Sequence, residues 1–368
     1  MTRVLGLALA ALLAVGVVVA IAVSVAPRFL PTPAPTVTVH GVIGSEKDPF
    51  FRDPQVQAVF HRNGVEVQVD TAGSREIATS VDLSRYDFAF PAGVPAAQKI
   101  KADHKAAAVY SPFYTPMAIA TFKPIVQLLV ANKLARDDGG YYDFDMQAYM
   151  GLVAKNARWS DFPANTAYPA GKSVLITSTD VRKSNSAAMY LAIASYVANG
   201  NNVVQDQATA AALVPKVAPL FLRQGFTESS SEAPFDDYLS IGIGKSPMVM
   251  IYEAQYLARV AAHDRAITPE MVLMYPGPEV LSKHTLVPLK PNGDRVGRLL
   301  SSDPELQRLA VKYGFRTNDQ GAFSSYLKSR GVPQPPQLVN VVEPPAFEPL
   351  ETVITGIDRL YGGATPTP

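Results

Sequence analysis

The chain has 368 residues, of which 33 are basic and 32 acidic, and it contains no cysteine. This near-neutral balance gives no electrostatic reason to expect nucleic acid or an anionic membrane surface as a partner. The lack of cysteine excludes disulfides, thiolate metal sites and a cysteine nucleophile. A chain of this length can form one large or two medium domains with their own core.

The N-terminal segment, residues 1–26, determines the expected compartment. A single cation, Arg3, precedes an uncharged apolar run from Val4 to Ala26. The apolar region of a secretory signal is about 7–15 residues long, whereas a membrane-spanning helix needs about 20. The run therefore predicts a transmembrane signal anchor with the body outside the cytoplasm. Cleavage after Ala26, which would release a secreted body, is the alternative, and Pro27 disfavours it.

Strand and helix patterns alternate through the first part of the body. The proline-rich residues 27–36 predict an extended spacer. Strand patterns at 36–46 and 65–76 end in Gly-Ser turns, a helix pattern at 48–64 separates them, and a third strand follows at 86–93. Strands spaced by helices favour a parallel sheet, and in such sheets ligands bind at the carboxyl ends of the strands.

A long apolar stretch, residues 106–135, is interrupted by prolines and predicts a strand that leaves the first sheet, then a helix from about Pro124. A second α/β run follows it. Its expected elements are a strand at 172–179, a helix at 184–199, a helical stretch at 207–225, a strand at 246–257, an extended segment at 271–289 and a helix capped by Asp303.

This order of elements predicts an α/β protein with two lobes joined by two extended crossings. The anchor (1–26) and the linker (27–36) come first. Lobe I is expected to comprise residues 37–112 plus 286–368, and lobe II residues 113–285.

The layout resembles the type 2 periplasmic-binding fold of extracellular solute-binding proteins, over about Val37 to Gly363. The stretches VIGSEK, TAGSRE, TSTDVRKSNSAAMYLAIASYV and KSPMVMIYEAQYL are similar to those of uncharacterised solute-binding proteins of actinobacterial type. They are more distantly similar to binders of molybdate, sulfate and phosphate. The resemblance implies a ligand held from both lobes by hydroxyls and backbone N–H groups at helix starts. Ser45, Ser74, Arg75 and the segment Thr179–Ser186 match that arrangement, whereas acids at Glu46, Glu76 and Asp180 and the missing lipobox depart from it.

Residues 177–200 concentrate polar groups just before an apolar helix pattern. The first turn of a helix leaves backbone N–H groups unpaired and carries partial positive charge, so added hydroxyls and a guanidinium predict an anion site. The alternative is that Ser184, Asn185 or Ser186 caps the helix while Asp180, Arg182 and Lys183 are solvated. The residues expected to bind the ligand are Ser45, Glu46, Ser74, Arg75, Ser111, Thr179, Asp180, Arg182, Ser184, Asn185, Ser186 and Glu253.

The acidic residues of this set leave the ligand's charge open. A fully ionised oxyanion offers only acceptors and is repelled by a carboxylate, whereas a protonated oxyanion, an ammonium group or a cation is not. Glu253 lies in an apolar run, where a bare carboxylate is costly. It is expected to be a buried ion-pair partner, a cleft ligand or the exposed end of the strand. Ser111 lies where the first crossing begins.

No motif predicts an enzyme. The five histidines are scattered without metal-ligand spacing, and no Gly-x-Ser-x-Gly, His-Glu-x-x-His or phosphate-gripping loop occurs. The sequence therefore predicts a membrane-tethered extracytoplasmic receptor that needs no cofactor. It closes two lobes around a small polar solute, with an oxyanion favoured, and delivers it to a membrane permease. The alternatives are a cell-surface interaction or envelope-assembly module without a small-molecule ligand and, less favoured, a hydrolase.

Overall fold

A computed structural model describes residues 36–163, 165–225, 228–333, 335 and 337–363. The chain divides into Met1–Val37 and a compact body, Thr38–Pro368. The predicted anchor, and all of the predicted spacer except Thr36, lie outside the described residues. Within the described residues, no helix combines the length and apolar character needed to cross a membrane.

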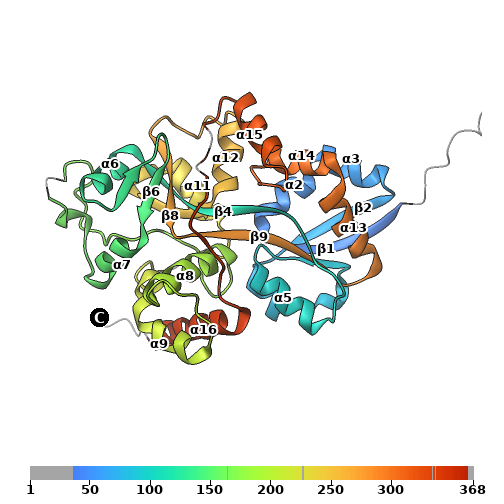
Figure 1. Cartoon of the computed structure of the whole chain (residues 1–368), viewed down its shortest axis with the longest axis horizontal. Coiled ribbons are helices and arrows are strands. Elements are labelled where there is room, and N and C mark those ends of the chain that lie inside the picture. Colours follow the sequence, from blue (N-terminus) through green and yellow to red (C-terminus); the bar gives the residue numbers. More distant parts are fainter. Residues whose placement is uncertain (1–35, 164, 226–227, 334, 336, 364–368) are drawn as a thin grey trace, which may run out of the picture. The chain divides into compact units, whose positions relative to one another are not determined.

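The body is a mixed α/β structure (Figure 1). Its strands are β1 (Val37–Ile43), β2 (Val65–Thr71), β3 (Phe88–Phe90), β4 (Tyr110–Phe122), β5 (Ala135–Asp137), β6 (Tyr142–Asp145), β7 (Met248–Tyr252), β8 (Met271–Gly277), β9 (Glu279–Pro288) and β10 (Val341–Val342). Its helices are α2 (Asp48–Arg52), α3 (Pro54–Arg62), α4 (Ser74–Thr79), α5 (Val94–Asp103), α6 (Lys123–Ala131), α7 (Met146–Ala154), α8 (Asn185–Ala198), α9 (Gln207–Val217), α10 (Pro219–Leu222), α11 (Glu232–Ser240), α12 (Glu253–Ala261), α13 (Pro291–Ser302), α14 (Pro304–Lys312), α15 (Gln320–Ser329) and α16 (Phe347–Gly363). A 3-10 turn, η1 (Ser45–Lys47), follows β1.

The strands follow the order β2-β1-β3-β9-β4-β8-β6-β5, with β10 beside β9 and β7 beside β4. The predicted parallel pairing occurs between β1 and β3 and between β6 and β8. The two long strands β4 and β9 instead pair antiparallel in the middle of the body, from Tyr110↔Leu286 to Pro116↔Leu281 (Figure 1). The sheet is therefore mixed rather than parallel, because the two extended crossings are themselves hydrogen-bonded neighbours.

Alternation along β1 places its side chains in two cores. Val39 and Ile43 pack in one cluster with residues of α3, α13 and α14, and Val42 packs in another with residues of α4 and α5. The sheet is thus covered by helices on both faces, as in an α/β layer structure. Gly41 is required because a Cβ there would overlap the ring of Phe88 on the neighbouring strand.

A third, larger core surrounds the second half of β4. The helix predicted at 184–199 is confirmed as α8, which is buried nearly all round, so its apolar pattern is not confined to one face. The helix α16 also belongs to this core through Leu350, Val353, Ile354 and Ile357. It lies beside α8 and α9 in Figure 1. The predicted lobe boundaries stay a prediction.

Several predicted elements were wrong in detail. The strand expected at 172–179 is reduced to isolated bridges at Ser173 and Thr177. Thr177 exchanges backbone hydrogen bonds with β7, whereas the N–H of Ile176 donates to the hydroxyl of Tyr149 at 2.9 Å, so the pairing does not extend along the segment. The helix expected at 48–64 is two helices, because Asp53 has extended backbone and caps a new helix at Pro54. The predicted cap at Asp303 and the helix from about Pro124 are confirmed.

Candidate functional site

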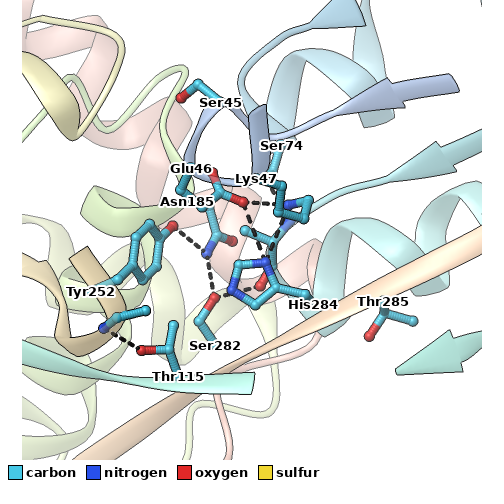
Figure 2. Close-up of polar contacts among 12 residues, drawn as sticks. Ser45, Glu46, Lys47, Ser74, Thr115, Asn185, Tyr252, Ser282, His284 and Thr285 are labelled. Atoms are coloured by element: carbon cyan, nitrogen blue, oxygen red, sulfur yellow. Dashed lines mark hydrogen bonds and ion pairs between the residues drawn. The ribbon is translucent and has the colours of Figure 1, made fainter. Parts of the chain in front are cut away.

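Polar residues from five segments meet in one buried network (Figure 2). The hydroxyl of Ser74, at the start of α4, accepts a hydrogen bond from the N–H of Ala92 at 2.9 Å. The hydroxyl of Ser282, on β9, donates to the carbonyl oxygen of Ala92. The amide Nδ2 of Asn185, in the first turn of α8, donates to Ser282 at 3.2 Å and to the hydroxyl of Tyr252 at 3.1 Å. The ends of β3 and β7 and the starts of two helices therefore converge.

A buried charged group adjoins this network after β1. Glu46 forms an ion pair with Lys47 through Oε1, and the same oxygen lies 3.3 Å from Nδ1 of His284. The Lys47 ammonium lies 3.2 Å from that nitrogen and 4.9 Å from the centre of the Phe90 ring. Lys47 and His284 are fully buried. Figure 2 shows the three side chains pointing toward one another.

Burial and mutual contacts shift the pKa values of all three side chains, and burial lowers the pKa of Lys47 against the opposing charge of Glu46. Burial alone would raise the pKa of Glu46, but the Lys47 charge and the His284 hydrogen bond outweigh it and lower the pKa to about 2. Burial lowers the pKa of His284 to about 4, and the Lys47 charge adds to that effect. The imidazole is therefore uncharged, and its Nε2 has no hydrogen-bond partner among the described residues.

The hydroxyls predicted to grip an anion before α8 bind one another. The hydroxyl of Ser186 lies 2.9 Å from that of Thr179 and 3.0 Å from that of Ser184, and all three residues are buried. Ser184 occupies the N-cap position of α8, yet its hydroxyl makes no capping hydrogen bond. These hydroxyl groups thus form an internal hydrogen-bonded network.

The charged residues of that segment form a second internal network with α16. Arg182 pairs with Asp180, with Nη2 to Oδ2 at 2.6 Å, and lies 3.4 Å from Asp358. Arg75 pairs with Glu351 and donates through Nη1 to the carbonyl oxygen of Arg182 at 2.9 Å. The Arg182 hydrogen bonds lower the pKa of Asp180 against the opposing effect of burial. The structure brings Arg75, Asp180 and Arg182 together as ion pairs of the fold.

Glu253 begins α12 rather than lying inside a strand, because β7 ends at Tyr252. Its carboxylate receives two hydrogen bonds from Arg316, at 2.7 and 2.8 Å, and one from the hydroxyl of Tyr275 at 2.6 Å. A fully buried carboxylate bound by a forked guanidinium fits the ion-pair alternative. At the crossing, the hydroxyl of Ser111 lies 2.9 Å from that of Thr285.

A pocket of about 730 Å³ opens beside the buried network. Its lining includes Glu46, after β1, and Tyr252, at the end of β7. The hydroxyl of Ser45 lies 3.1 Å from that of Ser230, which in turn accepts the N–H of Glu232 at 3.3 Å. The other residues that line the pocket are Pro49, Glu232, Phe235, Ala254, Gln255, Ala258, Arg259, Ala261, Ala262, Arg308, Lys312, Tyr313, Phe315, Tyr326 and Arg330.

Sequence reasoning missed Lys47, Ser282 and His284 as members of the site, although Lys47 ends the VIGSEK stretch. Ser282 and His284 lie in an extended apolar segment whose pattern marks neither as polar contact residues. Only strand pairing brings them there, because β9 runs beside both β3 and β4. Among the described residues, no group of histidine and acidic side chains could hold a metal ion.

Comparisons with known proteins identify the fold. No protein-family model and no curated protein matches the sequence. The structure matches that of the sulfate-binding protein SubI from Mycobacterium tuberculosis H37Rv with a TM-score of 0.51 and 15% identity, over 89% of this chain and 99% of that one. It matches an ABC transporter structure from Clostridium perfringens with a TM-score of 0.51 and 13% identity, over 88% of this chain and 98% of that one. The chain has the mixed α/β fold of type 2 periplasmic-binding proteins.

Proposed function

We propose that the chain is a solute receptor outside the cytoplasm, which binds a small polar solute and passes it to a membrane permease. The observation that carries the proposal is the pocket of about 730 Å³ that is lined by Glu46, which follows β1, and by Tyr252, which ends β7. Type 2 binding proteins use the carboxyl ends of such strands for ligands, as open α/β sheets generally do. The proposal assigns no catalytic step and no cofactor to the chain.

In this proposal, solute binding shifts the population between an open and a closed arrangement of the two lobes. Lobe I (37–112 plus 286–368) and lobe II (113–285) approach or separate about β4 and β9, and a solute that contacts both stabilises the approached state. Separate hydrophobic cores around β1–β3 and around the second half of β4 support this division. In this division α16 reaches from lobe I into the core of lobe II.

The sequence favours an oxyanion as the solute, and the match to a sulfate-binding protein supports this choice. The contacts in the site count against it. The hydroxyls of Thr179 and Ser184 both lie within hydrogen-bond distance of that of Ser186, and Arg182 pairs with Asp180. Two of the three O–H groups are therefore already used, and an oxyanion would have to displace these contacts to bind more than one of the hydroxyls.

The compartment follows from the apolar N-terminal run, which we propose tethers the body to the membrane. A reporter enzyme that is active only outside the cytoplasm, fused after residue 368, should be active in intact cells. Deletion of residues 1–26 should abolish its activity. A reporter that stays active after this deletion would contradict both the tether and the permease partner.

Calorimetric titration of the purified full-length chain with sulfate, molybdate, phosphate, amino acids, polyamines and sugars tests the receptor. At least one solute should bind with a Kd below about 100 µM and make the chain more compact in small-angle scattering. If no solute of the panel binds, the receptor function fails and the surface interaction module is favoured.

A further inference from the structure

The pocket beside Glu46 has the size of a site for an organic molecule. Its volume, about 730 Å³, falls in the range of roughly 300–1,000 Å³ typical of sites that bury drug-sized ligands. A tetrahedral inorganic oxyanion would contact only a small part of such a wall. The dimensions therefore favour a solute with a carbon skeleton.

The wall of the pocket carries two carboxylates. Glu46 contributes an ionised carboxylate, and the contacts from Lys47 and His284 both use its Oε1. Glu232, at the start of α11, lines the same pocket and is near enough for the charge of Glu46 to raise its pKa. Carboxylates accept hydrogen bonds and repel anions, so this part of the wall suits a group that donates.

Glu232 lacks a cationic partner among the described residues. Its Oε1 receives a hydrogen bond from Nε2 of Gln255 at 3.0 Å, and it forms no ion pair there. Burial raises the pKa of Glu232, and the charges of Asp236 and Glu46 add to this against the opposing effects of Gln255 and Arg259. A donor that arrives with the solute would relieve this partly buried charge.

The remaining walls suit an organic body rather than a bare ion. Phe235, Tyr313, Phe315 and Tyr326 supply aromatic surface. The cations Arg259 and Lys312 already pair with Asp264 and Asp53, at 2.9 and 2.7 Å. Of the other two cations that line the pocket, Arg308 lies 4.0 Å from Glu305, whereas Arg330 donates to the carbonyl oxygen of Ala261 at 2.6 Å and forms no ion pair among the described residues. Three of the four lining cations therefore already have a carboxylate partner.

We infer that the solute is an organic molecule that presents hydrogen-bond donors, from an ammonium group or from hydroxyls, to Glu46 and Glu232. This inference rests on the proposed receptor function and names the class of its ligand. Hydrogen bonds to charged acceptors are stronger than those between neutral groups, so the carboxylates supply both affinity and selection against anions.

The test titrates the full-length chain with three sets of solutes: sulfate, molybdate and phosphate; amino acids and polyamines; and sugars and polyols. Glu232→Gln keeps the side-chain shape and removes the charge. Ala258→Leu on α12 fills part of the apolar wall without weakening the helix. Glu66→Gln, an exposed residue on β2, is the matched control. Circular dichroism establishes that each variant is folded.

A solute of the amine or the hydroxyl set should bind, and each pocket variant should weaken it at least tenfold while Glu66→Gln leaves it unchanged. The set that binds identifies the donor as ammonium or hydroxyl. Binding of an inorganic oxyanion that Glu232→Gln and Ala258→Leu leave unaltered would overturn the ligand class but keep the receptor function. Absence of binding in all three sets would overturn both.

Discussion

The guanidinium of Arg75, at the start of α4, donates through Nη1 to the backbone carbonyl oxygen of Arg182, 2.9 Å away in the loop before α8. A second contact brings the same two segments together, since a Cβ on Gly73 would overlap the carbonyl oxygen of Lys183. A hydrogen bond from a side chain to the backbone therefore joins two segments that are more than a hundred positions apart in the sequence.

Arg75→Gln should lower the free energy of unfolding by about 1–2 kcal/mol. The substitution removes the partly exposed ion pair with Glu351 and the charged hydrogen bond to Arg182. Urea denaturation measures the change. Arg136→Gln, which breaks the exposed pair with Asp143, is the control and should change stability by less than about 0.5 kcal/mol. Equal effects of the two variants would show that the Arg75 contact does not stabilise the body.

Gly73→Ala should loosen the contact between α4 and the loop before α8 without straining its own backbone. Gly73 has φ −63° and ψ 143°, which any residue adopts, so the effect reports the overlap with the Lys183 carbonyl oxygen and a lesser crowding of the Glu76 carboxylate. Hydrogen exchange at the first turn of α8 should become at least tenfold faster. Gly151→Ala in α7, where a Cβ meets no neighbouring atom, should leave exchange unchanged.

Glu253→Gln should destabilise the chain by about 3–5 kcal/mol, because it leaves the largely buried charge of Arg316 without a partner. The double variant Glu253→Gln with Arg316→Met removes both charges and should recover most of this loss. Thermal and urea unfolding give the comparison. A double variant no more stable than the single one would contradict the ion-pair role and reopen Glu253 as a ligand residue.

Stability should fall on acidification in two ranges. The pKa of His284 is lowered from 6.5 to about 4, so its neutral form stabilises the fold above pH 6.5 and this stability is lost as the pH falls toward 4. The pKa of Glu46 is lowered from 4.5 to about 2, so its contribution is complete above pH 4.5 and disappears as the pH falls toward 2. Each group contributes a slope of up to about 1.4 kcal/mol per pH unit.

Denaturation of the His284→Gln variant at a series of pH values isolates the first range. The variant should lose the pH dependence between 6.5 and 4 and keep the part below 4.5. A wild-type curve that is flat from pH 6.5 to 4.5 would mean that His284 takes up no proton on unfolding.

The alternation of strand and helix patterns was enough to predict the α/β fold, and strand ends were a sound guide to proximity. Ser74 and Asn185 join the same buried network, through Ala92 and Ser282. Their partners could not be predicted. Ser282 and His284 are brought there by the pairing of β9, and Glu351 by the packing of α16, both far along the chain.

The predicted strand at 172–179 shows a second limit. Its apolar residues Val174 and Ile176 are buried as a strand pattern requires. The backbone hydrogen bonds nevertheless do not form a continuous ladder: Thr177 bonds to the backbone of β7, whereas the N–H of Ser178 donates to the side-chain amide oxygen of Gln224. Periodicity reports which side chains are buried, but it does not report what satisfies the backbone.

The C-terminal helix α16 contacts α4 through the pair of Glu351 with Arg75, α5 through Phe347 near Lys99, and the loop before α8 through Asp358. If the cleft must widen to admit its cargo, these contacts act as a latch that has to release first. Entry would then be gated, so the observed association rate would level off at high cargo concentration at the rate of release. Substitutions of Glu351 and Asp358 that remove these ion pairs would raise both that plateau and the initial slope with concentration, because the released state becomes more populated.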